Sequence, residues 1–156
     1  MSLPETGRIA GIDFGTVRIG IAITDPAQSL ASPYEIYQVK NPRLDEKYFR
    51  EFARNERLVG FVVGLPVHLS GQDSQISIQA EEFAKWLREL TGLPVLLFDE
   101  RFTSAFADEV VREAGLTRKK RKQLLDKLAA QILLSNYLES KASRGGGNSA
   151  SHGIGD

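Results

Sequence analysis

Two short apolar runs near the amino terminus predict a β-hairpin. Residues 8–14 (RIAGIDF) and 18–24 (RIGIAIT) are rich in isoleucine and flank a tight connection at residues 15–17. Residues 34–39 (YEIYQV) alternate between apolar and polar side chains, which predicts a third strand, antiparallel and at or near an edge of the sheet. These three strands are therefore expected to form an antiparallel meander.

After residue 40 the pattern alternates between helical and strand periods. Apolar side chains at helical spacing predict helices, and short apolar runs predict strands. The predicted helices cover residues 44–58, 74–90, 103–114 and 117–138, the predicted strands cover 58–65 and 95–98, and residues 66–73 are predicted to form a loop. This order favours an α/β fold whose mixed central sheet joins the meander to parallel strands, with helices on both faces. Ligands of such sheets bind beyond the carboxyl ends of the parallel strands.

Length and composition limit the classes of protein that need to be considered. The 156 residues correspond to one folded domain, expected over residues 1–142, followed by a flexible glycine- and serine-rich tail over residues 143–156. Twenty Lys+Arg against twenty Asp+Glu give a formal net charge of zero, which excludes a strongly basic coat but allows a local basic patch. The chain has no cysteine, which excludes disulfide scaffolds, thiolate zinc sites and cysteine nucleophiles.

The expected cellular location follows from what the sequence lacks. The first eight residues (MSLPETGR) have no apolar run of the kind found in a signal peptide. No stretch approaches the roughly 20 apolar residues that a membrane helix needs. We therefore expect a cytoplasmic protein with no membrane partner, and the lack of cysteine fits a reducing compartment.

Acidic residues at three separate places in the sequence are candidates for chemistry. Asp13 ends an apolar strand, Asp99 and Glu100 end the last predicted strand, and Asp126 lies in a helix that is otherwise apolar on its inward side. If the first and last strands were adjacent, these carboxylates would converge at one end of the sheet. Clustered carboxylates repel one another, so they share protons or hold a cation, and oxygen ligands select Mg²⁺ or Mn²⁺. Ions held in this way cleave phosphodiesters: one activates water and the other stabilises the leaving oxygen.

Strand alternation and simple structural alternatives limit this interpretation. Consecutive strand residues face opposite sides, so Asp99 and Glu100 are not expected to reach the same ion; we favour Glu100 and keep Asp99 as the alternative. Asp13 would also suit a turn cap, Asp99 and Glu100 a solvated turn, and Asp126 an ion pair one turn away on its own helix. Only the convergence of all three positions favours catalysis.

The helix that carries Asp126 opens with the basic run of residues 117–122 (TRKKRK). Cations at a helix amino terminus oppose the helix dipole, so this run favours phosphate binding over a purely stabilising role. The alternative is a solvated surface that promotes solubility. Few aromatic residues are interleaved, so contact with the nucleic-acid backbone is expected rather than base stacking.

Four segments together resemble a known family. They are DFGTVRIGIA from Asp13, GLP from Gly64 with Gly71 after it, DERFTS from Asp99, and RKKRK from Arg118 followed by DKLAAQILL. In this order, over residues 8–139, they resemble the YqgF/RuvX family. The resemblance implies the ribonuclease H-like fold shared with the RuvC Holliday-junction resolvases. It also implies a nuclease for the 5′ end of pre-16S ribosomal RNA or for Holliday junctions.

The resemblance also assigns roles to individual residues. It implies that Asp13, Glu100 (with Asp99 beside it) and Asp126 hold Mg²⁺ or Mn²⁺. Cations would then position backbone phosphates; these are Arg18, Arg101, Arg118, Lys119, Lys120, Arg121 and Lys122. Resolvases and ribonucleases H usually present four carboxylates, whereas the last predicted helix offers one, with Ala129 where a second could sit. This departure puts the second metal site in doubt.

Four functions compete at this point. The leading hypothesis is a metal-dependent nuclease that processes structured RNA, with RNA favoured over a DNA junction and ribosomal precursor particles as the setting. A Holliday junction resolvase would use the same chemistry but needs a two-fold dimer, so a monomer and a homodimer both stay open. Asp-Phe-Gly-Thr also resembles the first phosphate loop of sugar kinases, actin and Hsp70 chaperones, which need a second domain and a second loop. The fourth hypothesis is a non-catalytic RNA-binding module of the same fold.

Overall fold

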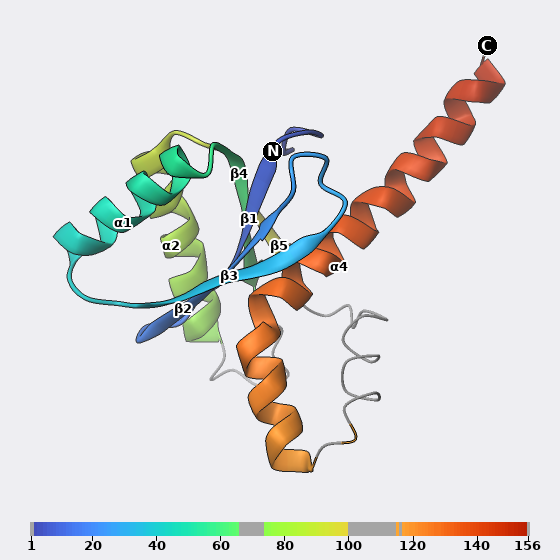
Figure 1. Cartoon of the computed structure of the whole chain (residues 1–156). Coiled ribbons are helices and arrows are strands. Elements are labelled where there is room, and N and C mark those ends of the chain that lie inside the picture. The colour runs from blue at the N-terminus through green and yellow to red at the C-terminus, as the bar shows by residue number, and fades with distance from the viewer. Residues whose placement is uncertain (1, 66–73, 100–114, 116, 156) are drawn as a thin grey trace.

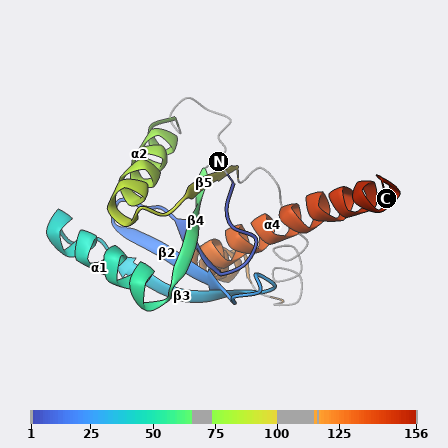
Figure 2. The same cartoon turned by 90° about the horizontal axis from the view of Figure 1, so that it is seen from above.

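The computed structural model describes residues 2–65, 74–99, 115 and 117–155, and shows one sheet with helices on both of its faces (Figures 1 and 2). The strands are β1 (Arg8–Asp13), β2 (Arg18–Thr24), β3 (Ala31–Gln38), β4 (Leu58–Leu65) and β5 (Val95–Asp99). The helices are α1 (Pro42–Asn55), α2 (Ser74–Thr91) and α4 (Arg118–Gly155). The predicted loop at 66–73 and the predicted helix at 103–114 lie outside the described residues.

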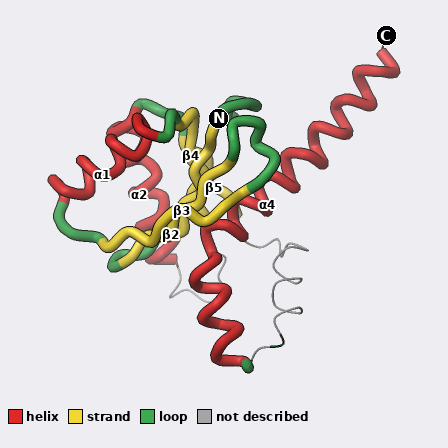
Figure 3. The backbone as a smooth tube through the Cα atoms, in the orientation of Figure 1, coloured by secondary structure: helices red, strands yellow, loops and turns green. Residues whose placement is uncertain are grey.

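The five strands lie in the order β3-β2-β1-β4-β5. Figure 3 shows the strands between α1 and α2 on one side and α4 on the other. β1 pairs antiparallel with β2, and β2 antiparallel with β3, which confirms the predicted meander with β3 at the edge. β1 pairs in parallel with β4, and β4 in parallel with β5. The sequence analysis made convergence of the carboxylates depend on adjacent first and last strands, but β4 lies between them. β1 and β5 are thus two strand spacings apart, or about 10 Å.

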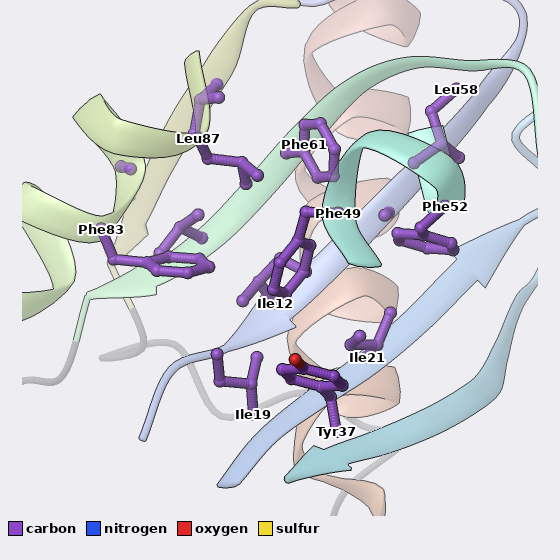
Figure 4. Close-up of a cluster of buried hydrophobic side chains, with 14 of the residues drawn as sticks. Ile12, Ile19, Ile21, Tyr37, Phe49, Phe52, Leu58, Phe61, Phe83 and Leu87 are labelled. Atoms are coloured by element: carbon purple, nitrogen blue, oxygen red, sulfur yellow. The ribbon is translucent and has the colours of Figure 1, made fainter. Parts of the chain in front are cut away.

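The larger part of the hydrophobic core lies between the sheet and helices α1 and α2. Phe49 and Phe52 from α1 and Phe83 and Leu87 from α2 point toward the sheet (Figure 4). The sheet contributes alternate residues of each strand to this side, among them Ala10, Ile12, Ile19, Ile21, Phe61 and Val63. The helical stripes predicted from the sequence therefore face the sheet as expected.

Helix α1 begins at an amino-terminal cap that lies before the start predicted from the sequence. The Asn41 side chain accepts a hydrogen bond from the Leu44 backbone N–H at 3.0 Å, and Pro42 follows at the first helical position. Both are favourable at a helix amino terminus, because the first backbone N–H groups lack helical partners and proline has none to lose. The helix therefore starts at Pro42, two residues before the predicted start.

Helix α4 covers the opposite face of the sheet with a second, smaller cluster. Leu133, Leu134 and Tyr137 pack there against strand residues that alternate with those of the main core, among them Ile9, Ala22 and Val62. The helix starts at Arg118, one residue after the predicted start. It continues to Gly155, whereas the sequence analysis ends the folded domain at residue 142. The backbone of residues 143–155 thus extends α4, and the flexibility of this segment in solution stays a prediction.

In the part of the chain that the structure describes, none of the helices is both long and apolar enough to cross a membrane.

Candidate functional site

Asp13 lies at the end of β1 and faces α4. Alternation along β1 puts Ile9, Gly11 and Asp13 on the side covered by α4, since Ile9 packs in the α4 cluster while Ile12 packs in the opposite core. Asp13 pairs across the antiparallel ladder with Gly20 of β2. On the other side, the Ile12–Val63 pairing of the parallel β1–β4 ladder sets Gly64 beside Asp13. The carboxylate therefore stands between two residues without side chains.

Glycine on β1 lets α4 pack unusually close to the sheet. A Cβ added to Gly11 would lie 2.9 Å from the Leu134 Cβ and 3.2 Å from the Ala130 carbonyl oxygen. One added to Gly20 would lie 3.6 Å from the Ala130 Cβ and 3.5 Å from the Asp13 Cβ. Residues four apart on a helix share a face, so Asp126 lies one turn before Ala130 on this same face. Packing at Gly11 thus holds Asp126 at the end of the sheet where β1 finishes.

The electrostatics of Asp13 confirm that the two aspartates lie near one another. Burial raises the pKa of the Asp13 carboxyl above its ordinary value of 3.8, and the negative charge of Asp126 raises this pKa further. Removal from water disfavours the ionised form, and a nearby like charge has the same effect. The structure therefore brings together two of the predicted carboxylates, one from each end of the chain.

One structural alternative, a turn cap at Asp13, lacks support among the described residues. The other, an ion pair of Asp126 one turn away on α4, would involve Lys122, whose side chain lies outside them. The Asp13 carboxylate accepts no hydrogen bond from the described residues of the β1–β2 turn, so it is not acting there as a turn cap. The salt bridge found in the described ranges joins Arg8 to Glu56 at 3.0 Å, and Asp126 forms none with a described cation. A half-buried carboxylate beside an exposed one, neither with a described cationic partner, suits an added cation.

The cross-strand register separates Asp99 from this pair. Asp99 pairs with Leu65, which packs in the core beneath α1 and α2, so Asp99 faces that side of the sheet. Phe98 packs instead in the α4 cluster, against Tyr137. Phe98 and Asp99 thus face opposite sides of the sheet, and the opposite orientation of Asp99 and Glu100 stays a prediction. Glu100 and Arg101 lie outside the described residues.

The predicted cations that the structure describes lie at the start of β2 and in the first turns of α4. Arg18 is exposed at the first position of β2. Arg118, Lys119 and Lys120 are exposed in the first turn of α4. At 1.5 Å per residue, they lie about 9–12 Å along the helix axis from Asp126. The Thr117 hydroxyl accepts a hydrogen bond from the Lys120 backbone N–H at 3.3 Å and so caps the amino terminus of α4. Arg121 and Lys122 also belong to α4, but their side chains lie outside the described residues.

The donor set at this end of the sheet fits a hard divalent cation. Carboxylate oxygens are the ligands that Mg²⁺ and Mn²⁺ prefer, and a bound cation would remove the repulsion between Asp13 and Asp126. No group of three potential ligand side chains gathers within the described ranges. The third predicted ligand, Glu100, lies outside them.

The packing near Asp13 requires glycine at positions 15 and 11, and the sequence pattern assigned no role to Gly11. Gly15 is required by the β1–β2 turn, because an added Cβ would lie 2.3 Å from the Arg18 carbonyl oxygen. The role of Gly11 depends on a helix from the far end of the chain, which no local pattern reveals. Strand alternation could have indicated it, because Gly11 is two residues before Asp13 and must lie on the same face of the sheet.

The strand order, the mixed pairing and the helix behind β1 define the ribonuclease H-like fold. RuvC of Thermus thermophilus in complex with a Holliday junction substrate shares it, with a TM-score of 0.54 at 18% identity over 87% of this chain and 96% of that one. A second Thermus thermophilus RuvC structure has a TM-score of 0.50 at 15% identity over the same shares of the two chains. At this level of identity the likeness concerns the fold.

Residues 7–140 match the RuvX family, which is described as Holliday junction resolvase, and the chain belongs to this family. A relative from Rhodopirellula baltica named "Putative pre-16S rRNA nuclease" is 51% identical over 142 residues, which are 91% of this chain and 82% of the relative. A relative of the same name from Koribacter versatilis is 42% identical over 135 residues, 86% and 88% of the two chains. The comparisons place the chain among nucleases, enzymes that hydrolyse phosphodiester bonds.

Proposed function

We propose that this protein is a divalent-metal-dependent nuclease that processes structured RNA, with the 5′ end of pre-16S ribosomal RNA as its substrate. The observation that carries the proposal is the meeting of Asp13 and Asp126 at the carboxyl end of β1. The sequence analysis expected both aspartates to be metal ligands. The names of the relatives support an rRNA precursor as the substrate.

The proposed ligands are Asp13, Asp126 and Glu100. A Mg²⁺ or Mn²⁺ ion held by them would supply Lewis-acid chemistry, activating water and stabilising the leaving oxygen. Asp13 is half-buried and its backbone is fixed by the ladder with β2, so it provides the rigid part of the site. Asp126 is exposed on α4 and completes the pair from the opposite side. Glu100 follows Phe98 by two residues, and strand alternation from Phe98 favours Glu100 over Asp99 as the third ligand.

The proposed substrate contacts are cations at both sides of the aspartates. Arg18, at the start of β2, and the first turn of α4 stand exposed, and the first turns of α4 project beyond the sheet (Figure 1). Phosphates bound by the 118–122 run and by Arg101 would place the backbone across the carboxylates. These contacts direct the backbone and carry no base sequence information, which suits recognition of an RNA by its structure.

Helix α4 contributes only one carboxylate to the proposed site, and this limits the number of metal ions that the site can hold. The position that follows Asp126 by three residues is Ala129, and the one that follows it by four is Ala130, which is buried against Gly20. Neither is a ligand. We propose that the site holds one ion firmly, and that turnover on the isolated protein is therefore slow.

A cleavage panel tests the proposal. Wild-type protein and Asp13→Asn are incubated with Mg²⁺ or Mn²⁺ and with 5′-extended pre-16S RNA, an unstructured single-stranded RNA and a four-way DNA junction. The expected result is metal-dependent cleavage of the precursor RNA by the wild type and none by Asp13→Asn. Binding of RNA without cleavage under either metal would contradict the proposed chemistry and favour a non-catalytic RNA-binding module.

A second candidate is a Holliday junction resolvase, which the description of the family and the fold of RuvC favour. The same carboxylates would serve it, but symmetric cleavage of a junction requires a two-fold dimer. Cleavage of the four-way junction in the panel, together with a dimer in light scattering when the junction is present, would establish this function over RNA processing.

A further inference from the structure

A row of cations runs along the outer face of α1, on the side of the sheet opposite to α4. Arg43, Lys47, Arg50 and Arg54 follow one another at intervals of four, three and four residues, and all four are exposed. This spacing keeps them on one face of the helix, while Phe49 and Phe52 occupy the face that is buried against the sheet. The row spans about 16 Å, at 1.5 Å per residue.

These cations form no ion pairs with the described acidic residues around them. Among the described residues, none of the four forms a salt bridge; the one that is formed joins Arg8 to Glu56. Other nearby carboxylates are engaged by tyrosines. Asp45 accepts from the Tyr37 hydroxyl at 2.6 Å and from the Lys40 backbone N–H at 3.0 Å. Glu56 also accepts from the Tyr34 hydroxyl, and Glu35 accepts from the Tyr48 hydroxyl.

The row lines a hollow in the surface. The hollow has a volume of about 610 Å³, and the four cations line it together with Glu46 and Glu51. The helix is thus positive on this face, four cations against two carboxylates. If the cations served only to stabilise α1, they would be expected to pair with Glu46 and Glu51 one turn away, and in the described structure they do not.

The row starts from the end of the sheet that carries the aspartates. β3 ends beside the β1–β2 turn, where Gln38 pairs with Arg18 and the Val39 backbone N–H donates to the Val17 carbonyl oxygen at 2.9 Å. The chain then leaves β3 and turns into α1 (Figure 1), so exposed Lys40 and then Arg43 follow. Exposed cations thus continue from Arg18 around the edge strand onto α1.

We propose that the outer face of α1 is a second nucleic-acid contact surface, on which Arg43, Lys47, Arg50 and Arg54 bind the phosphate backbone of a substrate strand leaving the site past the β1–β2 turn. This inference rests on the proposed function in that it takes the ligand to be the substrate. It implies a substrate that continues well beyond the cleaved bond, as an rRNA precursor does. Phosphate contacts of this kind supply affinity without sequence preference.

Binding measurements test this surface separately from catalysis. Lys47→Gln/Arg50→Gln is compared with Lys85→Gln/Arg88→Gln, which removes the same two cation types at the same spacing from exposed positions on α2. Dissociation constants are measured in EDTA, over a range of salt concentrations, for a short single-stranded RNA and for the same RNA with a long single-stranded tail. Thermal denaturation confirms that both variants fold.

The α1 variant is expected to bind the tailed RNA more weakly and to bind the short RNA as the wild type does. Its slope of log affinity against log salt for the tailed RNA should fall by about 1.4, or roughly 0.7 for each lost single-strand contact. An affinity and a slope equal to those of the α2 control would overturn the inference while leaving the proposed function intact. Weaker tailed-RNA binding by the α1 variant, in a protein that never cleaves, would uphold the surface and contradict the proposed chemistry.

Discussion

Gly11 on β1 and Leu134 on α4 approach so closely that a Cβ on Gly11 would lie 2.9 Å from the Leu134 Cβ. This contact sets the height of α4 above the sheet. Ala130, one turn earlier, lies over Gly20, and Asp126, one turn earlier again, lies near Asp13. The distance between the two aspartates therefore depends on a glycine that takes no part in chemistry.

We predict that Gly11→Ala destabilises the protein and weakens cleavage. The added methyl group meets the Leu134 Cβ and the Ala130 backbone, so α4 must shift, at a cost of about 1–3 kcal/mol, which is typical of overpacking. Denaturant unfolding measures the loss. Gly20→Ala is the matched control for stability, because its methyl group would make contacts of ordinary length at 3.5 and 3.6 Å. Equal losses in the two variants would contradict this account of the packing.

We predict that Glu100→Gln abolishes metal-dependent cleavage and that Asp99→Asn retains it. Asp99 pairs with Leu65 and faces the core beneath α1 and α2, away from Asp13. Glu100 is the next residue and is favoured by alternation. Initial rates on the preferred substrate of the panel distinguish the two variants, and the reverse order of activities would show that Asp99 is the ligand.

We predict that Asp25 makes stability sensitive to acid. Its side chain accepts hydrogen bonds from the Ser29 hydroxyl and from the backbone N–H groups of Ser29 and Leu30, which lower its pKa from 3.8 to about 2. A carboxyl whose pKa is lower in the folded protein stabilises the fold above its unfolded pKa, and this stability is lost as the pH falls through the folded pKa.

Denaturant unfolding of Asp25→Asn and wild type between pH 6 and pH 2 checks the Asp25 prediction. The wild type is expected to be the more stable at pH 6, and the difference should shrink from about pH 4 down to about pH 2. Ser29→Ala lacks the hydroxyl donor that lowers the pKa of Asp25. In this variant the stabilisation by Asp25 should therefore be lost at a higher pH. A difference independent of pH would show that the charge of Asp25 does not contribute.

We predict that Thr117→Ala loosens the first turn of α4. The variant loses the hydrogen bond from the Lys120 backbone N–H, which is worth about 1 kcal/mol at a helix amino terminus. Amide hydrogen exchange at Lys120 should become faster, and Thr117→Ser, which retains a hydroxyl, should exchange as the wild type does. Unchanged exchange in Thr117→Ala would show that the cap does not hold this turn.

Strands with a strong local signal were predicted well from the sequence. β2 and β4 have the predicted bounds, because their continuous apolar residues are buried on both faces of the sheet. β3 begins at Ala31 rather than Tyr34, since it is extended by pairing with β2 across an irregularity between Ile21 and Ala22. Ser32 and Pro33 break the local pattern, and only the partner strand makes the segment extended.

The site was predicted in its parts but not in its assembly. Asp13 and Asp126 stood out because each interrupts an apolar element, and the structure brings them together. The strand order does not follow from local patterns, so β4 was not expected between β1 and β5. The cations of α1 were passed over because their spacing, at one face of a helix, is also that of an ordinary solvated surface.

The central claim is that Asp13 and Asp126 share one divalent cation, and a double-mutant cycle of thermal stability with and without Mn²⁺ tests it most directly. A cation that binds only the folded protein stabilises it, so Mn²⁺ should raise the Tm of the wild type. Asp13→Asn, Asp126→Asn and the double variant should all lose this rise to the same extent, since a shared ligand makes the losses non-additive. A Tm rise that survives in both single variants, or losses that add in the double variant, would contradict a shared ion.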